Sequence, residues 1–387
     1  MTVSRLAEMP GIGVDRMGAA ADAAAAAGSE LLRLENLDTD LRPPRAALEA
    51  TRRAVEEDDA NSYLPFHGRH TLRRAVVRHV GQAAGVDYDP GAQCIITAGG
   101  LSGCLVALLA LLEPGDEVIM TDPTYIGMIN RVRLGGGRPR LVPFVRDGAA
   151  WRLDHDALKA AVTPRTKAFF IMSPSMPSGA VLDAADWTAI AELCRAADAW
   201  LLYNAAMERI LYDGRPCIHP ASLPGMAERT ITVGSVSKEH RMIGWRVGWV
   251  VGPASVMADV GLVSISDVVV PVGIAQEAAR TALETPAEDV AQAVAEWQRR
   301  RDVIAEELAD LPLIPAAGSW SMLFDTGALG HDGEVASRRL MERGAIAATP
   351  MVNWGEVNGP QFVRFVFSNE PVERLRGIGE RVRRALC

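Results

Sequence analysis

The 387-residue chain is predicted to be an α/β protein. We expect a three-layer α/β/α large domain with a mostly parallel seven-stranded sheet, plus a smaller α+β domain. From about residue 92 onward, short and nearly continuous apolar runs alternate with longer helical patterns, which is typical of a sheet covered by helices on both faces. After about Leu283 the pattern changes to a long charged helix followed by shorter elements, which indicates a second lobe.

Seven apolar runs are expected to form the strands of the large sheet. They are Cys94–Ala98, Glu117–Thr121, Arg140–Phe144, Lys167–Ser173, Trp200–Asn204, Thr230–Ser235 and Trp245–Val251. Helical patterns lie between several of them, including Ser102–Leu112 and Ala184–Ala196. The turn Glu113–Asp116, which contains proline and glycine, ends the first of these helices.

The large domain is expected to span residues 46–285. The smaller domain would combine an N-terminal arm, residues 1–45, with residues 286–387. The latter segment begins with a long helix over Pro286–Leu308 and ends with a C-terminal helix near Val372–Ala385. A chain of this length is long enough for two such lobes.

Composition excludes several classes of protein. Lysine and arginine number 40 against 48 acidic residues, and no basic stripe is present, so we expect no nucleic-acid partner. The five cysteines are scattered without a CxxC pair, which favours reduced thiols in the cytoplasm over disulfides or a metal site. No run reaches the roughly 20 apolar residues of a membrane span, and the N-terminus lacks the pattern of a signal peptide.

Ligands of open α/β sheets bind beyond the carboxyl ends of the strands. There, the first strand is followed by the glycine-rich turn Gly99–Gly103, which opens directly into a helix. Small residues let backbone amides approach an anion, and a helix N-terminus adds partial positive charge. The turn is neither GxGxxG nor a P-loop, which argues against dinucleotide and nucleoside triphosphate sites.

The sixth strand leads into a segment with two hydroxyls, an amine and a guanidinium. It ends in Ser235-Val236-Ser237-Lys238, and Arg246 follows shortly afterwards. Together these groups predict an anion site that contains an amine. A partly desolvated lysine near an arginine favours its neutral form, which suits Schiff-base chemistry.

The pattern Ser-x-Ser-Lys-x5-Gly-x-Arg-x-Gly resembles the cofactor-lysine signature of class I/II aminotransferases, the aspartate-aminotransferase-like enzymes of fold type I. These enzymes depend on pyridoxal 5′-phosphate (PLP). Four further segments resemble the family in the same order over nearly the whole chain: Asn61-Ser62-Tyr63 with Gly68 and Leu72-Arg73, Pro114–Val118, Asp122–Tyr125 and Phe362–Phe365. The resemblance implies the fold type I architecture and an amino acid substrate.

The resemblance also implies residue roles. Lys238 would hold PLP as a Schiff base and then move the substrate's α-proton, serving first as nucleophile and then as general base. A set of hydrogen-bond donors would hold the phosphate. It comprises the hydroxyls of Ser235, Ser237 and Ser102, the Arg246 guanidinium, and the amides of Gly100 and Leu101.

Three further roles follow from the same resemblance. Tyr125 would stack on the pyridine ring of the cofactor. Arg364 would clamp the α-carboxylate of the substrate bidentately, which selects amino acids over simple amines. Tyr63 would reach the phosphate bound by a neighbouring subunit, which implies a homodimer.

The sequence departs from the family at positions that tune the cofactor. Met176 stands where the family has the asparagine that donates to the cofactor's O3′, and Met207 replaces a tyrosine that donates to the same atom. Asn204 replaces the aspartate that pairs with the pyridinium nitrogen. Leu37 lies near a position that is often glycine, which suggests a reshaped substrate pocket.

These departures change the expected chemistry. Without an anionic partner the pyridinium proton is less favoured, so the ring is a poorer electron sink, although Asn204 can still hydrogen-bond it as a neutral group. Loss of both O3′ donors should keep the Schiff base protonated to higher pH. Ser175 and Tyr203 are candidate replacement donors. Candidate lining residues of the substrate pocket are His67, His240, Trp354 and Met128.

An amino acid aminotransferase is therefore the expected function, and alternatives remain. The same scaffold supports specialised biosynthetic enzymes that run β-elimination, γ-replacement, cyclisation or decarboxylation-linked deamination, since fold does not determine the reaction. A non-catalytic PLP-fold binding module is a second alternative. The segment Ser235–Lys238 also fits the Ser-x-x-Lys motif of penicillin-recognising hydrolases, but the chain lacks the Lys-Thr-Gly and Ser-Asp-Asn elements that this class requires.

Overall fold

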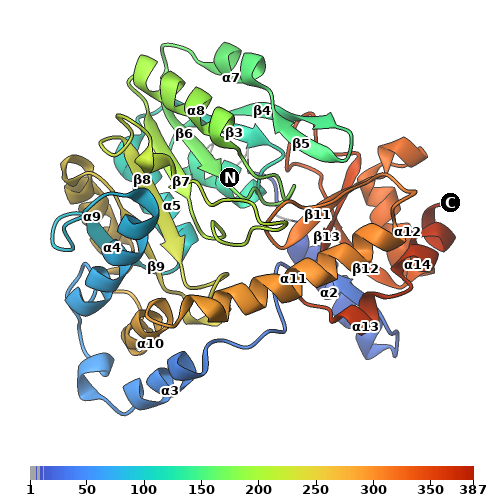
Figure 1. Cartoon of the computed structure of the whole chain (residues 1–387), viewed down its shortest axis with the longest axis horizontal. Helices are drawn as coiled ribbons and strands as arrows, with labels where there is room; N and C mark the ends of the chain where they lie inside the picture. Colours follow the sequence, from blue (N-terminus) through green and yellow to red (C-terminus); the bar gives the residue numbers. More distant parts are fainter. Residues whose placement is uncertain (1–5, 7–8, 12) are drawn as a thin grey trace.

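A computed structural model describes residues 6, 9–11 and 13–387, and its largest element is an eight-stranded sheet (Figure 1). The strand order is β2-β9-β8-β7-β6-β3-β4-β5. The strands are β2 (Cys94–Thr97), β3 (Glu117–Asp122), β4 (Arg138–Asp147), β5 (Ala150–Leu153), β6 (Thr166–Met172), β7 (Trp200–Asn204), β8 (Thr230–Ser235) and β9 (Gly248–Val251). The central run from β8 to β4 is parallel, whereas β9 and β5 are antiparallel to their neighbours.

All seven predicted strands are present, and the structure adds an eighth. The extra strand β5 forms a hairpin with β4 around Gly148, which has a positive φ of 59°. Only Leu153 of β5 is fully buried, so this strand has no continuous apolar run that would have predicted it. The strand expected over Trp245–Val251 begins later, at Gly248, because Ile243–Trp245 forms a single 3-10 turn, η3.

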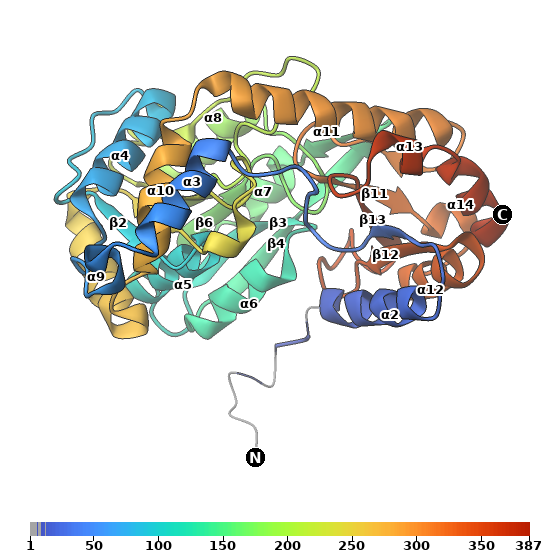
Figure 2. The same cartoon turned by 90° about the horizontal axis from the view of Figure 1, so that it is seen from below.

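Helices cover both faces of this sheet and complete the predicted three layers (Figure 2). One face packs against α5 (Gly100–Leu111), α6 (Ile126–Leu134) and α9 (Ala254–Val268). The other packs against α7 (His155–Ala161), α8 (Ala184–Ala196), α3 (Arg45–Ala54), α4 (His70–Ala84) and α10 (Gly273–Leu283). Side chains alternate between the faces along a strand, so neighbours such as Phe169 and Phe170 enter different cores.

A second sheet of five strands forms the smaller lobe, with the order β1-β12-β13-β11-β10. Its strands are β1 (Leu32–Leu34), β10 (Leu313–Ile314), β11 (Ser321–Asp325), β12 (Ile346–Pro350) and β13 (Phe362–Val366). Helices α2 (Val14–Ala26), α12 (Gly333–Gly344), α13 (Val372–Leu375) and α14 (Ile378–Leu386) pack around it. The sheet joins both ends of the chain, because β1 pairs in parallel with β12. The domain boundaries at 45/46 and 285/286 stay predictions.

The C-terminal helix predicted as one element is two. Gly377 has a φ of 82°, a left-handed conformation that ends α13 and precedes α14. Upstream, α11 (Ala287–Glu307) is the longest helix of the described residues and connects the two lobes (Figure 1). Among the helices of the described residues, none has the length together with the hydropathy that a transmembrane span requires.

Candidate active site

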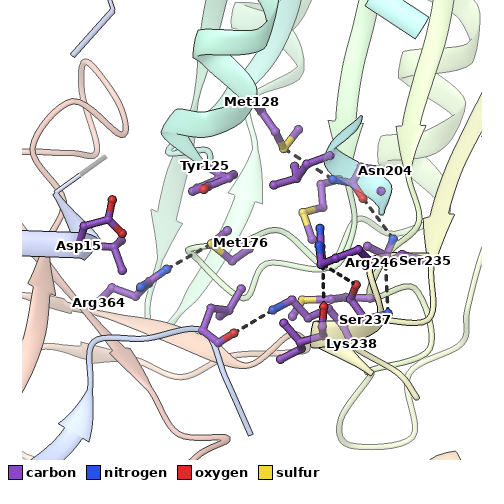
Figure 3. Close-up of a pocket in the computed structure, with 18 residues that line it drawn as sticks. Asp15, Tyr125, Met128, Met176, Asn204, Ser235, Ser237, Lys238, Arg246 and Arg364 are labelled. Carbon is purple, nitrogen blue, oxygen red and sulfur yellow. Dashed lines mark hydrogen bonds between the residues drawn. The ribbon is translucent and has the colours of Figure 1, made fainter. Parts of the chain in front are cut away.

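A cavity of about 310 Å³ lies between the two lobes, at the carboxyl ends of the parallel strands (Figure 3). Its walls come from strand ends, the start of α5, the loop after β8, strand β13 and the first turn of α2. The lining residues are Val14, Asp15, Leu37, Gly100, Leu101, Tyr125, Met128, Met172, Met176, Asn204, Ala206, Met207, Ser235, Ser237, Lys238, Ile243, Arg246 and Arg364. The structure thus brings together most of the predicted site residues.

Two predicted site residues do not line the cavity. The Ser102 hydroxyl donates to the Asp267 carboxylate of α9 at 3.2 Å, because its position in the first turn of α5 directs it away from the sheet edge. The expected contact of Ser102 with the phosphate is therefore not supported. Tyr63 is 85% exposed and lies outside the cavity, so its predicted role would require a second subunit.

Of the four candidate lining residues of the substrate pocket, Met128 alone lines the cavity. Trp354 lies behind the wall, where it packs against Tyr125. His67 packs against α9, since a Cβ at Gly261 would lie 2.9 Å from its Nε2. His240 is buried beside Arg209.

One end of the cavity gathers donors suited to an anion. Gly99, in the loop before α5, has a φ of 87°, and a Cβ at this position would collide with the Arg246 guanidinium. Only glycine therefore lets the backbone of this loop approach Arg246. Arg246 donates to the Ser237 hydroxyl at 3.4 Å, and the Ser237 amide donates to the Ser235 hydroxyl at 3.3 Å. With the first-turn amides of α5, beginning at Gly100, these groups form a cradle for a phosphate.

Lys238 lies beside this cradle. Lys238 is half-buried in the cavity wall, and its amine donates to the Leu37 carbonyl oxygen at 2.8 Å. Burial lowers the pKa of Lys238 to about 7, and the positive charges of Arg364 and Arg246 act in the same direction. A large share of the amine is consequently neutral near pH 7, which is the form that attacks an aldehyde or accepts a proton.

Arg364 reaches the cavity from β13 in the smaller lobe and is only 1% exposed. Its guanidinium donates to the Glu35 carbonyl oxygen and to the Met176 sulfur, and it lies 4.9 Å from the Trp354 ring centroid. Among the described residues, its Nε has no hydrogen-bond partner and no carboxylate pairs with it. Burial lowers the pKa of Arg364 to about 10. A buried cation with an unused donor is a binding site for an anion.

Tyr125 forms part of the wall between these two ends. It occupies the residue before α6, and its ring centroid lies 5.2 Å from that of Trp354. A Cβ at Gly127 would collide with the tyrosine ring, so the glycine lets the ring fold back over the first turn of α6. An aromatic face is thereby held at the edge of the cavity.

The opposite wall, at the end of β7, is neutral and rich in sulfur. The Asn204 amide nitrogen lies 3.8 Å from the Met128 sulfur, and its oxygen accepts from the Ala206 amide at 3.2 Å. The Met207 sulfur accepts from the Ser319 hydroxyl at 3.1 Å. This wall therefore offers a bound ring one amide and several thioethers but no carboxylate.

Neither candidate replacement donor reaches the cavity. The Tyr203 hydroxyl donates to the Ser173 carbonyl oxygen at 3.0 Å on the other face of the sheet, where its ring packs against Trp187. Strand alternation explains this, since Tyr203 and Asn204 are consecutive and point to opposite faces. Ser175 is buried outside the cavity lining. The suggestion that either restores the missing donor is wrong.

Several lining residues were not predicted from the sequence. Met172 is the last residue of β6, so the rule that ligands bind at strand ends could have identified it. Ala206 directly precedes Met207, and Ile243 lies in the segment between Lys238 and Arg246. Val14 and Asp15 come from α2, and no local pattern in the sequence indicates that this helix begins at the cavity.

Comparison with known proteins decides the family. The model of the family described as "Aminotransferase class I and II" matches residues 32–379. The chain belongs to the class I and II aminotransferases. Similar members include the arginine–pyruvate transaminase of Pseudomonas aeruginosa, 35% identical over 338 residues that cover 86% of this chain and 84% of that protein. A probable N-succinyldiaminopimelate aminotransferase of Mycobacterium tuberculosis is 34% identical over 88% of this chain and 90% of that protein.

Solved structures agree with this assignment. The M. tuberculosis N-succinyldiaminopimelate aminotransferase superposes with a TM-score of 0.90 at 33% identity and covers 99% of both chains. An aspartate aminotransferase of Thermus thermophilus, solved with maleate, gives a TM-score of 0.91 at 30% identity over 100% of both chains. The aminotransferase described here therefore has the fold type I architecture, is an enzyme of the transferase class, and takes PLP as its cofactor.

The residues present fit that cofactor at two of its three recognition points. The anion cradle around Arg246 matches a phosphate, and the buried amine of Lys238 matches an aldehyde. At the third, the neutral Asn204 replaces the carboxylate expected for a pyridinium nitrogen. This aminotransferase thus keeps the groups that hold PLP and lacks the usual group that tunes its ring.

Proposed function

We propose that this aminotransferase transfers the α-amino group of an amino acid to a keto acid, with Lys238 as the catalytic amine. The observation that carries the proposal is the position of this buried amine, which lies between an anion cradle and the unpaired guanidinium of Arg364. Relatives named for arginine–pyruvate, N-succinyldiaminopimelate and aspartate transamination support an amino acid as substrate.

The proposed binding of the cofactor follows from the cradle. The phosphate would accept hydrogen bonds from the hydroxyls of Ser235 and Ser237, from the Arg246 guanidinium, and from the amides of Gly100 and Leu101. The aromatic face of Tyr125 would cover the ring. When bound, PLP supplies an aldehyde that condenses with amines and a ring that delocalises electrons from the α-carbon.

The remaining steps belong to side chains of the protein. Arg364 would bind the α-carboxylate through two parallel N–H donors and so orient the α-hydrogen of the substrate. The Lys238 amine, with a pKa of about 7, would accept the proton from the α-carbon of the substrate and deliver it to C4′, the aldehyde carbon of the cofactor. Its lowered pKa makes both transfers possible near neutral pH.

The test of this proposal is a screen of amino acids with several keto acids, with products identified by mass spectrometry. We expect a keto acid product from the wild-type enzyme and none from Lys238→Ala. The chain contains three lysines, Lys159, Lys167 and Lys238, so borohydride reduction and peptide mapping can assign the cofactor unambiguously. An adduct on another lysine would contradict the assignment, and an alkene or cyclised product would contradict transamination.

We also propose that the enzyme is a homodimer in which Tyr63 reaches the partner's phosphate. Exposed apolar side chains support this: Tyr63, Phe66, Leu262, Val268, Val269 and Val272. They come from segments that pack together, since Gly273 at the start of α10 fits closely against Ala60 of η1 (Asp58–Asn61). Exposed apolar side chains on neighbouring segments are typical of interaction surfaces. Sedimentation at the monomer mass across micromolar concentrations would contradict the proposal.

We also propose that the enzyme acts in the cytoplasm. All five cysteines are free thiols, and burial raises the pKa of the Cys94, Cys104 and Cys194 thiols, so that they stay protonated and inert. Cell fractionation with a tagged chain would test this location, and recovery from an extracellular or periplasmic fraction would contradict it.

A further inference from the structure

The cavity contains a carboxylate that the proposed chemistry does not use. In the part of the chain that the structure describes, Asp15 is the only acidic residue that lines the cavity. Figure 3 shows it on the same side as Arg364 and across from Asn204 and Ser235. It belongs to the first turn of α2, which brings the N-terminal segment to the substrate end of the site.

Under the proposed function, each lining cation has a partner of its own. Lys238 takes the cofactor aldehyde, Arg246 the phosphate and Arg364 the α-carboxylate. Asp15 is then left without a positive partner, because its neighbour Arg16 pairs with Glu334 at 2.9 Å. Among the described residues, no ion pair involves Asp15.

The wall near the substrate end suits a long aliphatic chain. It includes the aliphatic side chains of Val14 and Leu37 and the thioether of Met176, which contacts Arg364. Unbranched methionines adapt to the shape of a flexible ligand, and basic side chains lay their methylene stems along apolar surfaces while the charged end stays near water. A carboxylate at the edge of such a wall matches that charged end.

We propose that Asp15 selects amino acids whose side chain ends in a positive charge. This inference rests on the proposed function and narrows its substrate to the class of basic amino acids. Asp15 is solvent-exposed, so the preference should be moderate, about fivefold in kcat/KM, as for an ion pair that is partly screened by water.

The test compares substrates of similar shape whose side chains differ in charge. Arginine is compared with citrulline, and lysine with norleucine, in the wild-type enzyme, in Asp15→Asn and in Asp22→Asn. Asp22 lies on the same helix, pairs with Arg33 at 2.9 Å and does not line the cavity, which makes it a matched control. We expect Asp15→Asn to reduce the arginine-to-citrulline ratio of kcat/KM about fivefold through KM, and Asp22→Asn to leave that ratio at the wild-type value.

A binding measurement separates this inference from the proposed function. Calorimetry with α-methylornithine and α-methylnorvaline, which lack an α-hydrogen and cannot be turned over, should show tighter binding of the cationic ligand, and Asp15→Asn should remove the difference. Equal weakening of both ligands would mean that Asp15 only shapes the pocket. Tighter binding of both would mean that Asp15 competes for Arg364, and either result overturns the inference. Failure of the proposed function would instead appear as the absence of any keto acid product.

Discussion

At the scale of single residues, the chemistry depends on how burial and charge set the properties of Lys238 and Asn204. The pKa of Lys238 is lowered to about 7 by burial and by the positive charges of two guanidinium groups. Asn204 hydrogen-bonds without carrying charge. The site therefore combines an activated amine with a neutral partner for the cofactor ring, and each property has a separate test.

The lowered pKa of Lys238 predicts how the cofactor-free protein captures PLP. Only the neutral amine attacks the aldehyde, so the capture rate should rise with pH through about 7 and become constant above it. An amine with the ordinary pKa of 10.5 would show a rate that continues to rise up to that pH. Stopped-flow absorbance between pH 6 and about 9.5 measures the profile. A rate still increasing tenfold per pH unit above pH 9 would contradict the prediction.

Asn204→Asp should speed turnover. A carboxylate beside the ring nitrogen would form a charge-assisted hydrogen bond, and we expect kcat to increase by about tenfold, which corresponds to about 1.4 kcal/mol. Without cofactor, the same carboxylate would be buried beside Met128 with no counter-charge, so the cofactor-free variant should melt at a lower temperature than wild type and recover when PLP binds. A variant slower than wild type would show that the neutral amide suits the reaction better.

At the scale of elements, the loop after β8 is held in place by a partly buried ion pair. Arg209, which follows the Asn204 segment, donates to the Glu239 carboxylate at 2.6 Å, and its backbone amide donates to the same carboxylate at 2.9 Å. Glu239 directly follows Lys238, and its side chain is only 5% exposed. The pair thus joins the segment that faces the cofactor ring to the segment that carries the amine.

Arg209→Met should destabilise the protein because the buried Glu239 carboxylate loses its cationic partner and keeps only the hydrogen bond from the backbone amide of residue 209. We expect a loss of about 2 to 5 kcal/mol in the free energy of unfolding, measured by urea denaturation. The control is Arg45→Met, which removes an exposed pair with Glu49 on α3 and should cost below about 0.5 kcal/mol. Equal losses of unfolding free energy in the two variants would show that the pair of Arg209 with Glu239 stabilises the protein no more than an exposed ion pair does.

At the scale of the whole molecule, the proposed dimer would complete the phosphate site through Tyr63. Tyr63→Phe should weaken PLP binding about tenfold, the loss of one hydrogen bond to a charged group, while sedimentation stays that of the dimer. Tyr88→Phe is the matched control, because that hydroxyl is buried and has no partner among the described residues. Cofactor release during dialysis, followed by absorbance, measures the difference. If Tyr63→Phe retained PLP as well as the wild-type enzyme does, the proposed contact of Tyr63 with the phosphate would be contradicted.

The predictable part of this structure is the part with local signals. The strand ends and the lysine segment around Lys238 were predicted because each combines an apolar run with a short motif. The structure does not support the phosphate contact predicted for Ser102, because the direction of this side chain depends on the rotation of α5 and on the distant Asp267. Asp15 and Trp320, whose ring lies 4.8 Å from the Lys238 amine, were missed because they reach the site only through the folding of the smaller lobe.

The residues that line the cavity come from distant parts of the chain, and this affects the order in which the site forms during folding. The groups of one subunit that are proposed to bind the phosphate of its own cofactor lie between Gly100 and Arg246, within one continuous stretch of the chain. Arg364, by contrast, reaches Glu35 only after β13 has joined the sheet in which β1 pairs with β12. During synthesis on the ribosome, the residues that bind the cofactor phosphate are therefore made first. Arg364, which is proposed to bind the substrate carboxylate, takes its place only when the last quarter of the chain has packed against the N-terminal strand β1.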